Sequence, residues 1–144
     1  MIEQAGAATG VPAAWIAAEI LHESGGNPTA GSPADAHGLM QLEPSTAATY
    51  GCTHRGNPLC SVRAGARYLA ALHRQLQSWR GASAGYYGGG FEAHVLQAAG
   101  LRPLVSWAQA AAMLNVVPNP LAAYANALYA TAEQLIQQQH LPPL

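Results

Sequence analysis

The chain has 144 residues, of which half are hydrophobic and 9% are charged, as is typical of a folded globular domain. Six arginines, seven acidic residues and no lysine give a formal net charge of −1, so the sequence lacks the basic face that nucleic-acid binding requires. No apolar segment approaches the roughly 20 uninterrupted residues of a membrane helix. We therefore expect a single domain over residues 1–144, with no nucleic-acid partner and no transmembrane segment.

The N-terminal region predicts a short helix. Met1–Gln4 contains neither the basic nor the apolar region of a signal peptide, so none is visible in this chain. Residues 1–10 are small and weakly patterned, and Gly10 is a suitable C-terminal stop for a helix.

The next predicted helix carries the carboxylate on which the functional prediction rests. It opens with Pro12 in its first turn and ends at Gly25-Gly26-Asn27-Pro28, which cannot continue a helix. Glu23 therefore lies in the last turn, near the negative end of the helix dipole and beside apolar Ile20, and both effects favour the protonated acid. Glu19, one turn earlier, is expected to face solvent. If it shared a cleft with Glu23, like-charge repulsion would raise one pKa further.

The rest of the chain also predicts helices and no strong β-hairpin. Apolar spacing and Gly and Pro stops indicate helices over residues 44–50, from Asn57 or Ser61 to about Trp79, 91–99, 104–114, and from Pro120 onward. On the long helix Arg63, Arg67 and Arg74 are expected to form a solvated face, and His73 is expected to be a partly buried histidine rather than a ligand. The predicted fold class is all-α, or mainly α with little or no sheet.

Two cysteines, Cys52 and Cys60, lie eight positions apart, a spacing that fits no common four-ligand zinc site. We therefore predict no metal site and favour a disulfide. Closing a loop of this length contributes about 2.6 kcal/mol by the chain-entropy model. Two unpaired thiols in a reducing compartment are the alternative, whereas pairing points to the periplasm or the cell exterior.

Residues 23–47 contain an ordered motif, Glu-Ser-Gly-Gly-Asn-Pro followed by Gly-Leu-Met-Gln-Leu. This stretch resembles the signature of the soluble lytic transglycosylase family, whose fold is like that of goose-type lysozyme. The resemblance implies that Glu23 is the catalytic acid and base and that Ser24 supports it. It also implies that the glycan cleft is lined by Gly38, Leu39, Met40 and Gln41.

Later tyrosines extend the resemblance. Residues 82–90 occupy the place of the family's Ala-Tyr-Asn-Ala-Gly motif, in which Tyr and Asn line the cleft. Tyr86 matches the Tyr, whereas Tyr87 stands in place of the Asn and changes the hydrogen bonding offered to one sugar subsite. Tyr124 matches a final-helix Tyr that reaches the catalytic Glu in the family, and core packing is the alternative for this residue.

The reaction implied by the resemblance needs one carboxylate, peptidoglycan as substrate, and no cofactor. The acid protonates the glycosidic oxygen between N-acetylmuramic acid and N-acetylglucosamine. Its conjugate base then takes the proton of the muramoyl 6-hydroxyl, which attacks its own anomeric carbon and leaves a 1,6-anhydro end. We expect such a chain in the periplasm, outside the cell or elsewhere in the cell envelope.

Two other functions remain open from the sequence. One is lysozyme-type hydrolysis with Asp35 placing a water, although Asp35 also suits a turn in left-handed geometry. The other is a non-catalytic glycan-binding or structural module of a secretion, conjugation or phage-tail apparatus, for which the replacement of Asn by Tyr87 is the only sequence motive.

Overall fold

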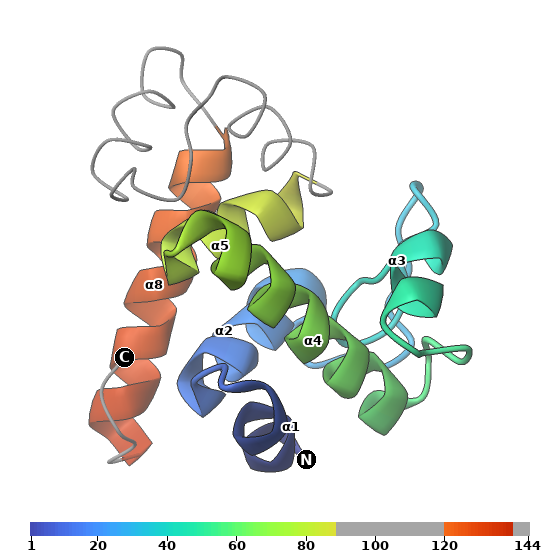
Figure 1. Cartoon of the computed structure of the whole chain (residues 1–144), viewed down its shortest axis with the longest axis horizontal. Coiled ribbons are helices and arrows are strands. Elements are labelled where there is room, and N and C mark those ends of the chain that lie inside the picture. The colour runs from blue at the N-terminus through green and yellow to red at the C-terminus, as the bar shows by residue number, and fades with distance from the viewer. Residues whose placement is uncertain (89–119, 140–144) are drawn as a thin grey trace. The chain divides into compact units, whose positions relative to one another are not determined.

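The computed structural model describes residues 1–88 and 120–139 of the chain. Figure 1 shows helices joined by loops, and the pairings of β type among these residues are isolated bridges rather than a sheet. The all-α prediction is therefore confirmed. The helices are α1 (Ile2–Thr9), α2 (Ala13–Ser24), α3 (Pro44–Thr49), α4 (Pro58–Leu76), α5 (Trp79–Tyr87) and α8 (Pro120–Gln139). The predicted helices over 91–99 and 104–114 lie outside the described residues.

The chain divides into two compact units. The first contains Met1–Tyr68 together with the chain from Thr131, and the second contains Leu69–Ala130. None of the described helices is both long and apolar enough to cross a membrane.

In the first unit, α1 packs against α2 (Figure 1). Gly10 ends α1, as predicted, and adopts the left-handed conformation with φ 77°. A Cβ on Gly6 would lie 2.8 Å from the Val11 carbonyl oxygen, so a larger residue at this position would push the following turn away. Pro12 is the N-cap of α2 and not part of its first turn. Trp15 has no exposed surface and forms part of the core.

α4 is capped at its start by Asn57, one of the two residues, Asn57 and Ser61, at which the sequence predicts the helix to begin. The Cys60 N–H donates to the Asn57 side-chain oxygen at 3.0 Å, which satisfies one of the free N–H groups at the helix start. Ser61 is instead fully buried and accepts a hydrogen bond from the Met40 N–H at 3.1 Å. Asn57 therefore caps the helix, while Ser61 joins it to the loop of residues 25–43 between α2 and α3, here called the motif loop.

In the second unit, α4 ends earlier than the sequence predicts. Its last residue is Leu76, and Gln77 adopts a left-handed φ of 52° that interrupts the helix. Ser78 then caps α5 by accepting a hydrogen bond from the Gly81 N–H at 3.2 Å. The prediction of one helix to about Trp79 was wrong, because this residue begins the next helix under its own N-cap.

Candidate active site

The last turn of α2 holds Glu23 at a defined helix end. Gly25 adopts φ 60° and its N–H donates to the Leu21 carbonyl at 3.1 Å, so the helix stops directly after Ser24. Glu23 is half-buried. The preceding residue, His22, makes a hydrogen bond of 2.9 Å with the Thr131 hydroxyl of α8. Glu23 thus lies in the last turn of a helix with a defined end, as the sequence predicted.

Ser24 joins this helix end to the motif loop. Its hydroxyl donates to the Leu39 carbonyl oxygen at 2.8 Å, with the Ile20 carbonyl at 3.1 Å as a second acceptor within reach. The same oxygen accepts a hydrogen bond from the Gly26 N–H at 3.2 Å. Because Ser24 directly follows Glu23, these bonds fix the backbone that carries the acid.

Gly38 is placed where only glycine fits. Its φ is 83°, and a Cβ would lie 1.9 Å from the Arg55 carbonyl oxygen. The Gly38 N–H donates to the Ala30 carbonyl at 2.9 Å. The motif loop therefore passes in direct contact with the backbone that precedes α4.

Leu39 and Met40 point into the core. Leu39 is 6% exposed and Met40 is 0% exposed. A Cβ on Gly65 of α4 would lie 2.5 Å from the Met40 methyl carbon, so this glycine makes room for the Met40 side chain. The two side chains hold the loop, and the place of Leu39 and Met40 in a glycan cleft stays a prediction.

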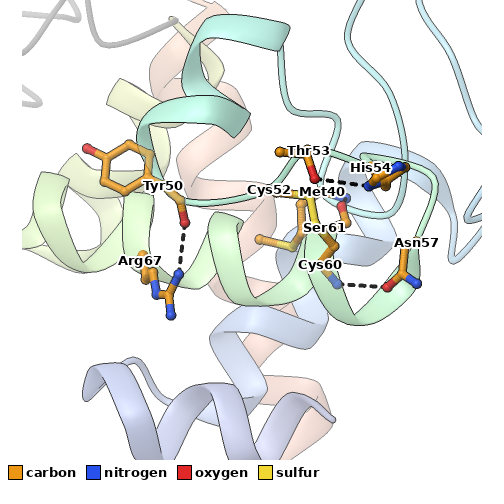
Figure 2. The surroundings of a disulfide bond; sticks show 9 residues. All are labelled: Met40, Tyr50, Cys52, Thr53, His54, Asn57, Cys60, Ser61 and Arg67. Atoms are coloured by element: carbon orange, nitrogen blue, oxygen red, sulfur yellow. Dashed lines mark hydrogen bonds between the residues drawn. A yellow bond between two sulfur atoms is a disulfide. The ribbon is translucent and has the colours of Figure 1, made fainter.

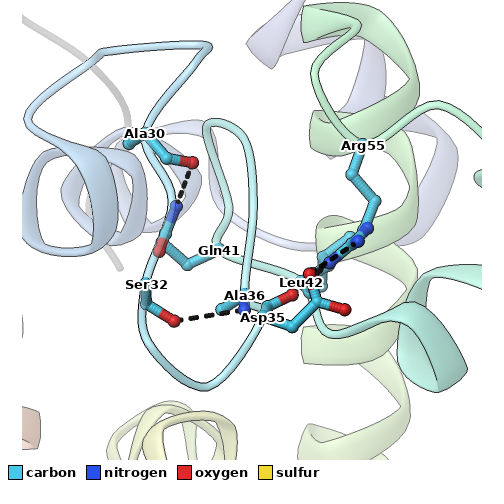
Figure 3. Close-up of polar contacts among 7 residues, drawn as sticks. All are labelled: Ala30, Ser32, Asp35, Ala36, Gln41, Leu42 and Arg55. Carbon is cyan, nitrogen blue, oxygen red and sulfur yellow. Dashed lines mark hydrogen bonds and ion pairs between the residues drawn. The ribbon is translucent and has the colours of Figure 1, made fainter.

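Gln41 also uses its side chain within the loop. Its amide nitrogen donates to the Ala30 carbonyl at 2.9 Å and to the Gly38 carbonyl at 3.0 Å. Figure 3 shows the side chain turned toward Ala30. In a hydrogen bond between the Gln41 side chain and a sugar, the amide oxygen would therefore be the acceptor.

Asp35 is a turn residue held by an arginine. Its φ of 58° is left-handed, as predicted. Its carboxylate lies 3.1 Å from the Arg55 guanidinium, which also bonds the Asp35 carbonyl and, at 3.0 Å, the Leu42 carbonyl (Figure 3). The pair closes the motif loop on the segment before α4.

The predicted tyrosines belong to the second unit. Tyr86 is buried, whereas 53% of Tyr87 is exposed. The rings of Tyr87 and Tyr124 lie 4.7 Å apart between centroids and are tilted by 32°, so the residue that replaces the family's Asn pairs with the final-helix tyrosine. Contact of these tyrosines with a glycan or with Glu23 stays a prediction.

Cys52 and Cys60 form the disulfide that the sequence favoured, with Cα atoms 5.3 Å apart. The bond ties the segment after α3 to the first turn of α4 (Figure 2). Among the described residues, no group of three His, Cys, Asp or Glu side chains could hold a metal ion.

The family model described as "Transglycosylase SLT domain" matches residues 1–100, more than half of the chain. The chain belongs to the transglycosylase SLT family. The resemblance predicted from residues 23–47 is thereby confirmed.

Individual relatives of this SLT domain agree. A stretch of 74 residues is 43% identical to membrane-bound lytic murein transglycosylase F 2 of Alkalilimnicola ehrlichii and covers 51% of this chain and 16% of that protein. A stretch of 81 residues is 42% identical to the endo-type membrane-bound lytic murein transglycosylase A of Klebsiella pneumoniae and covers 49% of this chain and 40% of that protein. The chain therefore spans less than half of the length of either relative.

Two solved structures share the fold of this SLT domain. The 70 kDa soluble lytic transglycosylase of Escherichia coli superposes with a TM-score of 0.78 at 21% identity, over 96% of this chain and 24% of that one. The lytic transglycosylase Slt of Pseudomonas aeruginosa was solved as an inactive variant with Gln in place of a Glu. It superposes with a TM-score of 0.77 at 23% identity, over 99% of this chain and 24% of that one.

One acidic residue of the SLT domain lies where the sequence prediction did not put it. Glu19 is 0% exposed, so the expectation that it faces solvent was wrong. It follows Trp15 by one helical turn and therefore shares the buried face of α2 with that side chain. Every buried side-chain nitrogen or oxygen among the described residues has a hydrogen-bond partner, as a buried carboxyl group requires. The four-residue spacing between Trp15 and Glu19 is the feature of the sequence that could have predicted this burial.

Proposed function

We propose that this SLT domain is a peptidoglycan lytic transglycosylase that acts through Glu23. Membership of the family supports the proposal, as do relatives that are themselves named lytic murein transglycosylases. The substrate that we propose is the glycan strand of peptidoglycan, cleaved between N-acetylmuramic acid and N-acetylglucosamine.

The observation that carries the proposal is the anchored helix end at Glu23. A general acid must be held within reach of the bond that it protonates, and precise positioning accounts for much of the rate. Here the half-buried acid precedes Ser24, whose hydroxyl bonds the Leu39 carbonyl of the motif loop at 2.8 Å. The end of a helix carries negative partial charge, which favours an uncharged acid over a carboxylate in its last turn.

One carboxyl group completes the proposed reaction. Glu23 donates its proton to the glycosidic oxygen as the bond from that oxygen to the anomeric carbon breaks. The Glu23 carboxylate then accepts the proton of the muramoyl 6-hydroxyl, whose oxygen bonds to the anomeric carbon. The acid is regenerated, no water is consumed, and the muramoyl unit ends as a 1,6-anhydro sugar.

The geometry gives hydrolysis less support. A hydrolase of lysozyme type would need a second carboxylate to act on water or on the sugar. Asp35 is the candidate that the sequence offers, but its carboxylate is engaged with Arg55 at 3.1 Å and its backbone forms a turn. We therefore propose the anhydro product rather than a reducing end.

We also propose that the domain works in the cell envelope, where its substrate lies. The Cys52–Cys60 disulfide supports this location, because such bonds persist in oxidising compartments. Wall turnover, a secretion or conjugation machine, and a phage tail would each bring the domain to this substrate.

The substitution Glu23→Gln tests the proposal, because it removes the proton and keeps the shape. We expect purified peptidoglycan to release no anhydromuropeptides with this variant, while its urea unfolding curve matches that of the unmodified protein. Glu3→Gln, which alters an exposed glutamate of α1, is the control and should cleave normally. Normal cleavage by Glu23→Gln would reject the role of Glu23.

Mass spectrometry of the products tests the reaction type separately. Anhydro ends support the transglycosylase, and reducing ends support hydrolysis. Saturable glycan binding with no product at any pH would instead favour a non-catalytic module.

A further inference from the structure

An open pocket of about 360 Å³ lies beside the disulfide in the first unit. Its walls come from the segment after α3 and from the first turns of α4, and include His54, Asn57, Cys60, Arg63 and Arg67. No residue of the proposed glycan site lines it. The proposed reaction therefore gives this pocket no role.

Four of the side chains that line the pocket, those of His54, Asn57, Arg63 and Arg67, are cationic or can donate hydrogen bonds, and Leu59 adds an apolar wall. Arg63 and Arg67 are both exposed and are four residues apart on α4, so they share one face of the helix. The whole chain has six arginines and no lysine, so a third of its permanent side-chain cations line this one pocket. Two guanidinium groups on one wall favour an anionic ligand.

No carboxylate neutralises these arginines in the part of the chain that the structure describes. The ion pair found there joins Arg55 to Asp35, and no described Asp or Glu lines the pocket. The Arg63 guanidinium makes no hydrogen bond to a described side chain or backbone group. Its guanidinium can therefore turn to a ligand without giving up a protein partner.

Arg67 is held in place before any ligand arrives. Its Nη1 donates to the Tyr50 carbonyl oxygen at 3.0 Å, as Figure 2 shows. A Cβ on Gly51 would lie 3.1 Å from this nitrogen, so the guanidinium packs against a glycine that leaves it room. Holding a cation in this way lowers the entropy lost when it binds a ligand.

The remaining polar groups also offer donors. The Asn57 side-chain oxygen is occupied by the Cys60 N–H at 3.0 Å, which leaves the amide nitrogen of Asn57 as its free donor. His54 Nδ1 lies 2.9 Å from the Thr53 hydroxyl, which leaves Nε2 for a ligand. Figure 2 shows both residues beside the disulfide, which fixes the two walls of the pocket to each other.

From these contacts we propose that the pocket beside the disulfide binds an oxyanion, a carboxylate or phosphate group carried by a cell-wall polymer. Arginine forks match the paired oxygens of both groups. The pocket would hold a peptide or phosphate substituent of the wall while the glycan is bound elsewhere. That the anion belongs to a cell-wall polymer rests on the proposed function, whereas the existence of an anion site does not.

Inorganic phosphate is the first probe, titrated into the ¹⁵N-labelled protein at constant ionic strength. We expect saturable shifts of the backbone amide signals of His54, Asn57 and Cys60. Arg63→Gln should weaken phosphate binding roughly tenfold, the effect of losing one charge-assisted hydrogen bond. Arg74→Gln is the matched control, since this exposed arginine lies farther along α4 and does not line the pocket. Shifts equal to those caused by chloride, or unchanged by Arg63→Gln, would overturn the proposal.

A second probe distinguishes the sources of the anion. A short stem peptide with free carboxylates, released from its sugar, is titrated in the same way. Tighter binding of the peptide than of phosphate assigns the pocket to peptide carboxylates, and the reverse order assigns it to phosphate-bearing polymers. Binding of neither probe would refute the site.

The Glu23→Gln variant separates this proposal from the catalytic one. It should keep the phosphate-induced shifts while losing cleavage. Arg63→Gln should still cleave glycan strands from which the peptides have been removed. Loss of the shifts in Arg63→Gln together with normal cleavage by Glu23→Gln would leave the anion site standing and remove the catalytic assignment.

Discussion

The Ser24 hydroxyl donates a hydrogen bond to the Leu39 backbone carbonyl at 2.8 Å, across 15 positions of the sequence. This bond joins the last residue of α2 to the loop with the Gly-Leu-Met-Gln motif, directly beside Glu23. Two separate parts of the family motif are thus one structural unit, in which the loop fixes the end of the helix that carries the acid.

Ser24→Ala should remove this connection while leaving the acid itself unchanged. We expect the free energy of unfolding to fall by about 1 kcal/mol, the net value of one hydrogen bond. Cleavage of peptidoglycan should slow by roughly tenfold, because a small displacement of a catalytic group has a large effect on rate. Urea denaturation and muropeptide release measure the two effects. Ser45→Ala, at an exposed position of α3, is the control. A Ser24→Ala variant as active as the control would contradict the role of this bond.

Gly38→Ala should damage the fold more than a left-handed backbone alone explains. Gly38 and Gly26 have nearly equal φ values, 83° and 84°, but a Cβ meets no atom within 4 Å at Gly26 and would lie 1.9 Å from the Arg55 carbonyl oxygen at Gly38. We expect Gly26→Ala to lose about 1 kcal/mol and Gly38→Ala about 3 kcal/mol or more. Urea unfolding of both variants measures the difference. Equal losses would show that the contact with Arg55 is unimportant.

Loss of the disulfide should lower stability without changing the chemistry. Replacing both Cys52 and Cys60 by Ser is expected to lower the free energy of unfolding by about 2.6 kcal/mol, the loop-closure value. A reducing agent should produce a similar loss in the unmodified protein and none in the double variant. If reduction leaves the unfolding curve of the unmodified protein unchanged, the bond does not stabilise the fold.

His73 should make the second unit less stable in mild acid. Its ring stacks on Trp79 with centroids 3.7 Å apart, and burial lowers its pKa from the ordinary value of 6.5. The unfolded chain therefore binds the proton more readily than the folded chain. The stabilising contribution is present above pH 6.5 and is lost as the pH falls from there toward the folded-state pKa.

The variant His73→Phe keeps an aromatic ring and removes the proton site. Between about pH 7.5 and about pH 5.5 its free energy of unfolding should fall less than that of the unmodified protein. Urea curves at both pH values provide the comparison. Identical pH dependence of the two proteins would exclude His73 as a contributor.

Several features were predictable from the sequence because they depend on local chemistry. The glycines after Ser24 end α2 where they tolerate a left-handed backbone, and Asn57 caps α4 through a short polar side chain. Asp35 adopts a left-handed φ of 58°, which aspartate tolerates better than most residues. The order of residues in the motif predicted the family, which the family model confirms, whereas the role of Glu23 as the acid stays a prediction.

Other features depended on which segments pack together, and local patterns did not reveal them. Glu19 is buried because the Trp15 face of α2 faces the core, although a charged side chain by itself suggests solvent. The Gln41 amide nitrogen is occupied by loop carbonyls, and Arg67 bonds to Tyr50 from 17 positions away.

The sequence by itself determined the all-α class, the glycine stop that places Glu23 in the last turn of α2, and the family, because caps, glycines and motif order act over a few residues. Only the tertiary structure decided that Ser24 anchors the motif loop and that Arg63 and Arg67 face a pocket beside the disulfide. The physical reason is that a hydrogen bond between distant segments, or a cavity between them, exists only once the chain has brought those segments together.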